Sequence, residues 1–128
     1  MQSAFKRPLV SVCLSGLFLC GLATLVQARG GYERARGLVD RTLNDLRRAS
    51  RLERGSKERE RYDNADRHLS QFDRELSRNR FDKDKLDLAI DDVNNVVERN
   101  TLSPRARDNL TQDLQDLRRL RETRGAGY

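Results

Sequence analysis

The chain has 128 residues, of which 36% are charged and 5% are aromatic, and it carries 26 lysines and arginines against 20 aspartates and glutamates. A chain of this length forms one small domain with little room for a deep catalytic cavity. It contains no G-x-S-x-G motif and no glycine-rich phosphate loop, so its size and motifs argue against an enzyme.

The N-terminal segment has the three zones of a secretory signal peptide. Two basic residues stand at positions 6 and 7, residues 9–26 are uncharged and largely apolar, and Val-Gln-Ala at positions 26–28 is a small-residue cleavage pattern. We therefore predict that residues 1–28 are a signal peptide, and that cleavage after Ala28 leaves Arg29 as the new N-terminus. This export signal indicates a periplasmic or secreted protein.

Two alternatives remain for the same segment. The apolar run at residues 9–26 is close to the shortest length that spans a bilayer, which would make it an inner-membrane anchor. Cys20 could mark a lipoprotein, although Leu19 precedes it where a small residue is usual. Both cysteines, Cys13 and Cys20, lie in this segment, so a cleaved chain has no thiol for a disulfide or a metal.

Charge alternates along the rest of the chain. Residues 29–61 carry 11 basic and 6 acidic groups, residues 62–98 carry 6 and 10, and residues 99–128 carry 7 and 4. This alternation favours complementarity between neighbouring helices over a single anion-binding face.

Four segments carry apolar residues at helical spacing, and the spacing predicts helices over residues 32–54, 57–78, 83–100 and 104–124. Gly37 weakens the first of them. The apolar positions are Tyr32, Ala35, Val39, Leu43, Leu46 and Ala49 in the first; Tyr62, Ala65, Leu69, Phe72 and Leu76 in the second; Leu86, Ala89, Ile90, Val93, Val96 and Val97 in the third; and Ala106, Leu110, Leu114, Leu117 and Leu120 in the fourth.

Residues between these segments suit helix ends. Ser56 can cap the second helix, Asn79 tolerates the left-handed conformation at its C-terminus, and Asp82 and Ser103 can cap the third and fourth. Phe81 and Leu86, on either side of Asp82, occupy the two positions of a hydrophobic staple. Pro104 suits the first helical position because no amide hydrogen is needed there.

The short connections predict an all-α fold, a small antiparallel up-and-down bundle of three to four helices. Residues 29–55 form an arginine-rich first helix whose docking on the others stays open, residues 56–124 form the core bundle, and residues 125–128 form a frayed tail.

The candidate anion-binding site is a basic segment at residues 47–61. Arg47, Arg51 and Arg54 would form one stripe along a helix, which can follow phosphates or anionic headgroups. Acidic residues interrupt the segment and no aromatic residue is present for base stacking, so nucleic acid is disfavoured and a solvated face is the alternative. The members of this basic segment are Arg47, Arg48, Arg51, Arg54, Lys57, Arg59 and Arg61.

The single histidine and the acidic third helix point to no metal site or cofactor. His68 has no carboxylate three or four residues away, which favours a structural or solvent-edge role. Asp84, Asp87 and Asp91 share one helix face, but the calcium-loop pattern that starts at Asp82 lacks its glycine and its final glutamate. We expect a solvated acidic face.

Three resemblances concern the helical part. Residues 89–100 resemble the second helix of a tetratricopeptide repeat. Leu-Thr-Gln-Asp-Leu-Gln at residues 110–115 resembles the L-T-x-x-Q signature of periplasmic stress chaperones of the Spy and CpxP kind. Residues 60–121 resemble small exported bacterial helical proteins of unassigned function, which implies export and a helical fold.

Together these features predict a non-enzymatic helical protein of the bacterial envelope that acts by surface interaction with protein partners, in a chaperone-like role. The alternative is an anion-binding module that uses residues 47–61 against nucleic acid, lipid headgroups or an acidic polymer. Membrane contact would arise through an uncleaved signal or through the basic face.

Overall fold

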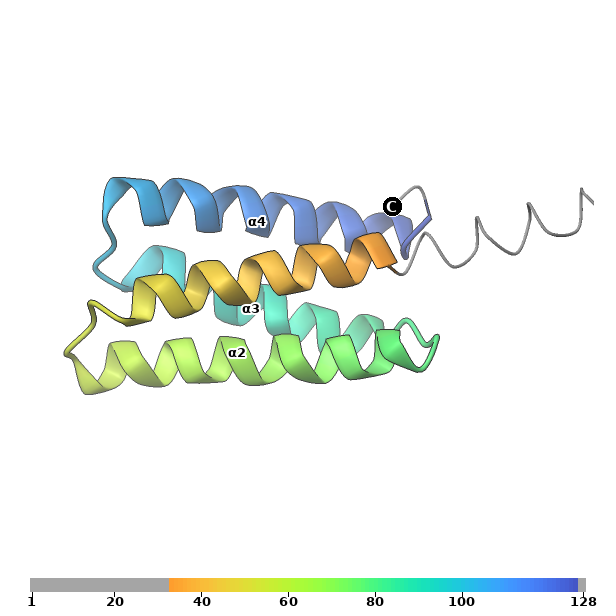
Figure 1. Cartoon of the computed structure of the whole chain (residues 1–128), viewed down its shortest axis with the longest axis horizontal. Coiled ribbons are helices and arrows are strands. Elements are labelled where there is room, and N and C mark those ends of the chain that lie inside the picture. Colours follow the sequence, from red (N-terminus) through yellow and green to blue (C-terminus); the bar gives the residue numbers. More distant parts are fainter. Residues whose placement is uncertain (1–32, 127–128) are drawn as a thin grey trace, which may run out of the picture. The chain divides into compact units, whose positions relative to one another are not determined.

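A computed structural model describes residues 33–126 of the chain, and this part is all-helical, without a strand. Residues 33–50, called here the N-terminal helix, are followed by α2 (Ser56–Ser77), α3 (Lys83–Arg99) and α4 (Pro104–Thr123). Consecutive helices run in opposite directions and lie side by side (Figure 1). The predicted all-α, up-and-down bundle is confirmed, with four helices in the described part.

The apolar stripes of all four helices meet in one core. Large side chains such as Leu46, Phe72 and Leu117 are at most 1% exposed, and burying a side chain of this size contributes about 1.5–3 kcal/mol. The core residues are Ala35, Leu38, Val39, Leu43, Leu46, Tyr62, Ala65, Leu69, Phe72, Leu76, Leu86, Ala89, Ile90, Val93, Val96, Leu110, Leu114, Leu117 and Leu120.

The N-terminal helix docks on the bundle through a stripe wider than its apolar spacing predicts. Leu38 and Thr42 are buried beside Val39 and Leu46. The Thr42 hydroxyl donates to the Leu38 carbonyl oxygen at 2.9 Å, so this buried polar group has a hydrogen-bond partner. The N-terminal helix therefore docks on the other three helices, which its sequence alone does not decide.

Three of the predicted helix-end features are present. The Asp82 carboxylate accepts from the Lys85 amide at 3.1 Å, and the Ser103 hydroxyl oxygen accepts from the Ala106 amide at 3.2 Å. Asn79 adopts a φ of 58°, the left-handed conformation that suits the end of a helix.

Two of the predicted helix ends are wrong. Gly55, and not Ser56, is the N-cap of α2, without a side-chain hydrogen bond. The N-terminal helix ends at residue 50, four residues before its predicted end. There the Ser50 hydroxyl donates to the Arg47 carbonyl oxygen, and a carboxylate oxygen of Glu53 accepts from the amides of Arg54 and Gly55. Such side-chain contacts compete with the continuation of a helix.

The signal peptide at residues 1–28, its cleavage site and the alternative anchor at residues 9–26 lie outside the described residues. Between residues 33 and 126, no helix is long and apolar enough to cross a membrane.

Candidate functional site

The basic segment divides into residues with internal contacts and residues without them. The Arg47 guanidinium pairs with the Asp66 carboxylate of α2 at 2.9 Å. Arg61 donates to the Asn100 side-chain oxygen at 3.0 Å, and Arg59 donates to the Glu53 carbonyl oxygen at 3.4 Å. These three side chains thus have partners inside the protein, which an anion would have to displace.

The other four members, Arg48, Arg51, Arg54 and Lys57, are exposed and have no acidic partner within residues 33–126. Because the N-terminal helix ends at residue 50, Arg51 lies in a turn and Arg54 in the following connection. The predicted stripe of Arg47, Arg51 and Arg54 along one helix is therefore wrong, and the exposed cations surround a connection instead.

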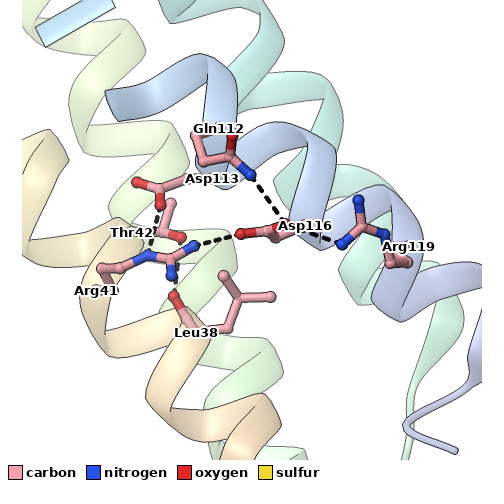
Figure 2. A network of polar contacts seen from close by, with 7 residues as sticks. All are labelled: Leu38, Arg41, Thr42, Gln112, Asp113, Asp116 and Arg119. Atoms are coloured by element: carbon pink, nitrogen blue, oxygen red, sulfur yellow. Dashed lines mark hydrogen bonds and ion pairs between the residues drawn. The ribbon is translucent and has the colours of Figure 1, made fainter. Parts of the chain in front are cut away.

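Arginines of the N-terminal helix join it to both of its neighbours. Arg36 pairs with Asp73 of α2 at 3.1 Å, as Arg47 does with Asp66. On the other side, the Arg41 guanidinium lies between two carboxylates of α4 (Figure 2). Basic groups of the N-terminal helix thus pair with acidic groups of the neighbouring helices, as the alternation of charge along the chain predicts.

In that network, Arg41 Nε donates to Asp113 Oδ1 at 2.7 Å and Arg41 Nη2 donates to Asp116 Oδ2 at 2.7 Å. Gln112 and Arg119 of α4 contact the other oxygen of Asp116, at 3.2 and 3.5 Å (Figure 2). Arg41 thus ties the N-terminal helix to α4 at two points.

Asp113 is 1% exposed, and its Oδ2 has no hydrogen-bond donor among the described residues. Burial raises the pKa of Asp113 to about 7; a hydrogen bond with the Asp45 carboxyl also raises it, and Arg41 opposes the rise. A carboxylate pair of this kind holds one proton between its members at a pH below the raised pKa.

A hollow of about 330 Å³ lies at the end of the bundle where residues 51–55 and 100–103 connect the helices. We call it the end hollow. Its apolar lining comes from Ala49, Leu52, Leu102 and Ala106. Asp45, Arg48, Glu53 and Arg105 supply its charged groups, and Thr101, Ser103 and Asn109 its neutral polar ones.

Leu52 is the most exposed large apolar side chain of the described part. It is 84% exposed, in the turn that follows the N-terminal helix, and the next is Leu88 of α3 at 49%. Leu52 lies beside half-buried Ala49, Leu102 and Ala106 in the lining of the end hollow. An apolar side chain next to a concave surface is typical of a binding site.

The charged groups of the end hollow differ in their contacts. Glu53 Oε1 accepts from the Arg54 and Gly55 amides at 3.1 and 3.2 Å. The pKa of Glu53 is lowered mainly by a hydrogen bond with Glu58 and further by these two amides. The carboxyl group of Asp45 forms a hydrogen bond with the carboxyl group of Asp113. The guanidinium groups of Arg48 and Arg105 have no acidic partner within residues 33–126.

A wider hollow of about 500 Å³ lies at the opposite end, beside residues 80–84. Four of its five charged lining residues form ion pairs, either with each other or with Lys85 and Asp87 just outside the lining. Glu75 contacts Arg80 at 3.2 Å and Lys85 at 3.3 Å, and Lys83 contacts Asp87 at 3.0 Å. Because most of the charged groups in its lining already form ion pairs, this hollow offers less to a charged ligand than the end hollow does.

His68 of α2 contacts the carboxylate of Asp92 on α3, and both side chains are about four-fifths buried. Its spacing along α2 could not reveal a partner 24 residues away. Asp87, a member of the acidic face, pairs with Lys83 and Arg121. No group of three or more potential metal ligands occurs within the part of the chain that the structure describes.

Sequence reasoning identified Arg48 and missed four other residues of this region: Asp45, Leu52, Arg105 and Asp113. A signal existed for Asp113, because it lies three residues after Leu110 and four before Leu117, on the apolar face of α4. Leu52 lies three residues after Ala49, but the helix ends at residue 50, so the apolar spacing does not reveal that Leu52 is exposed.

Comparisons with protein-family models, with curated proteins and with solved structures find no significant match for the chain.

Proposed function

We propose that this protein is an exported, non-enzymatic helical protein of the bacterial envelope that acts by binding other proteins through its surface. The observation that carries the proposal is the end hollow with Leu52, 84% exposed, in its lining. Residues 1–28 support export by their signal-peptide pattern, and the arginine-linked bundle supplies a rigid scaffold for the hollow.

A chaperone-like role is the more specific form of this proposal. An exposed leucine beside a hollow that is partly lined by apolar side chains can hold an apolar segment of an unfolded protein and delay its aggregation. The resemblance of residues 110–115 to the signature of periplasmic stress chaperones favours the same role.

The test is the aggregation of reduced, unfolding α-lactalbumin, followed by light scattering with the purified protein at equal molar ratio. We expect slower aggregation, and we expect Leu52→Ser to remove most of the effect. Leu88→Ser, which changes the other exposed leucine, is the matched control and should retain it. If the unaltered protein leaves aggregation unchanged, the chaperone-like role is wrong.

A second candidate function is anion binding by the basic segment, and one observation favours it. Arg51, Arg54 and Lys57 lie close together in sequence around an exposed connection and have no acidic partner among residues 33–126. Such cations attract phosphates or anionic headgroups at low salt.

Heparin retention at low salt tests this second function. Arg51→Glu with Arg54→Glu should elute at lower salt than the unaltered protein. A matched control is Arg74→Glu with Arg67→Glu, which makes the same change of charge on exposed positions of α2. Equal elution of the two double variants would rule out a specific role for the basic segment.

A further inference from the structure

The size of the end hollow limits what it can hold. At about 330 Å³ it lies near the lower end of the range of about 300–1,000 Å³ for ligand pockets. It therefore has room for one or two side chains, and not for a folded element. Its half-buried apolar lining from Ala49, Leu102 and Ala106 suits an aliphatic side chain.

The acidic groups of the end hollow are already engaged inside the protein. Glu53 accepts from two backbone amides, and Asp45 lies against the buried Asp113 carboxyl. A cationic ligand would have to compete with these contacts.

The basic groups of the end hollow are not engaged. Arg48 comes from the N-terminal helix and Arg105 from the first turn of α4, so they approach the hollow from two different helices. Neither has an acidic partner among residues 33–126. The first turn of α4 contains no acidic residue, and the positive end of a helix dipole adds to the attraction of an anion.

From these contacts we infer that the end hollow binds a segment of a partner protein in which an aliphatic side chain stands next to a carboxylate. The aliphatic group packs against Ala49, Leu102 and Ala106, while Leu52 covers it from the rim. The carboxylate lies between the guanidinium groups of Arg48 and Arg105. This inference rests on the proposed function and names the kind of partner that the same site takes.

Four short peptides test the inference, each acetylated, amidated and flanked by Gly-Ser, with Leu-Glu, Leu-Gln, Leu-Lys or Ala-Glu at the centre. Their Kd values come from amide shifts in NMR titrations of the labelled protein. We expect Leu-Glu to bind about threefold to fivefold more tightly than Leu-Gln, as for an exposed ion pair. Leu-Lys should bind more weakly still, and Ala-Glu about tenfold more weakly than Leu-Glu.

Charge reversal at Arg105 sharpens the test. Arg105→Glu should weaken Leu-Glu and strengthen Leu-Lys, so that the order of the two peptides is inverted. Arg74→Glu makes the same change of net charge on α2, far from the hollow in the chain, and should keep the original order. Both positions are exposed, so both variants should fold, which circular dichroism checks.

The outcomes separate this inference from the proposed function. Equal binding of Leu-Glu, Leu-Gln and Leu-Lys, or tightest binding of Leu-Lys, overturns the inference about the partner. If none of the four peptides binds, the inference is also overturned. The aggregation assay with Leu52→Ser tests the proposed function without these peptides, so either can fail while the other stands.

Discussion

At the end of the bundle that holds the α2–α3 connection, Glu75 contacts Arg78, Arg80 and Lys85. At the other end, around residues 51–55 and 100–103, Arg48 and Arg105 line a hollow without an acidic partner in the described part. Both ends join helices of the same bundle by short connections, and they differ in what covers them.

We call the α2–α3 end the closed end because aromatic packing covers its core and ion pairs engage most of the charged groups around its hollow. Phe72 and Phe81 meet edge to face with their ring centres 5.5 Å apart, and Phe81 also faces the backbone at Gly125, where an added Cβ would lie 3.9 Å from its ring. The opposite end exposes Leu52. Stability is gained at the first end, whereas the second leaves apolar and cationic groups in water, which folding alone does not require.

The largest expected effect is at the closed end. Phe72→Ala removes a fully buried ring and its contact with Phe81, and should lower the free energy of unfolding by about 3–5 kcal/mol in urea denaturation. Leu52→Ala at the open end should change it by less than about 0.5 kcal/mol. A large loss for Leu52→Ala would contradict the contrast between the ends.

A smaller effect concerns Asp113, the buried acid of α4 that contacts Arg41 of the N-terminal helix. The pKa of Asp113 is about 7 in the folded protein against an ordinary value of 3.8. The folded state thus keeps a proton that the unfolded chain loses, and the stability present at low pH is lost as the pH rises from about 4 to about 7. We expect a loss of about 1–3 kcal/mol, measured by urea denaturation at several pH values.

Asp113→Asn is the control for this pH dependence. The amide keeps the shape of the side chain and does not titrate, so the decline of stability between pH 5 and pH 7.5 should become shallower. If the unaltered protein and this variant show the same decline, Asp113 is not the titrating group.

The smallest effect concerns one residue at the N-terminus of each of two helices, Asp82 before α3 and Ser56 in α2. Asp82→Ala removes the cap of α3 at the closed end and should lower stability by about 1 kcal/mol. Ser56→Ala at the open end removes no capping hydrogen bond, because the N-cap of α2 is Gly55, and should be neutral or slightly stabilising. If Ser56→Ala lowers stability as much as Asp82→Ala does, Ser56 caps α2 after all, as its sequence position suggests.

Local patterns explain why the sequence predicts the fold so closely. The spacing of Tyr62, Ala65, Leu69, Phe72 and Leu76 specifies a buried helix face without any knowledge of its neighbours. The caps at Asp82 and Ser103 depend on residues only three positions away. These features are visible in one short window of sequence.

The candidate site depends on residues that are far apart in the chain. Arg41 and Asp113 are separated by 72 positions, and Arg48 and Arg105 line the same hollow only because the N-terminal helix docks beside α4. The early end of that helix depends on the contacts of Glu53 with two amides, which no apolar spacing records. The sequence therefore indicates the cations of this region and not the hollow between them.

The central claim is that one end of the bundle binds a partner and the other does not. Its most direct test uses the Leu-Glu peptide with a nitroxide spin label at its terminus. Amide signals close to the bound label broaden in the NMR spectrum of the protein. The amides of Leu52 and Ala106 should broaden strongly, and those of Phe81 and Asp84 should stay unchanged. Broadening around Phe81 and Asp84, or equal broadening at both ends, would contradict the account.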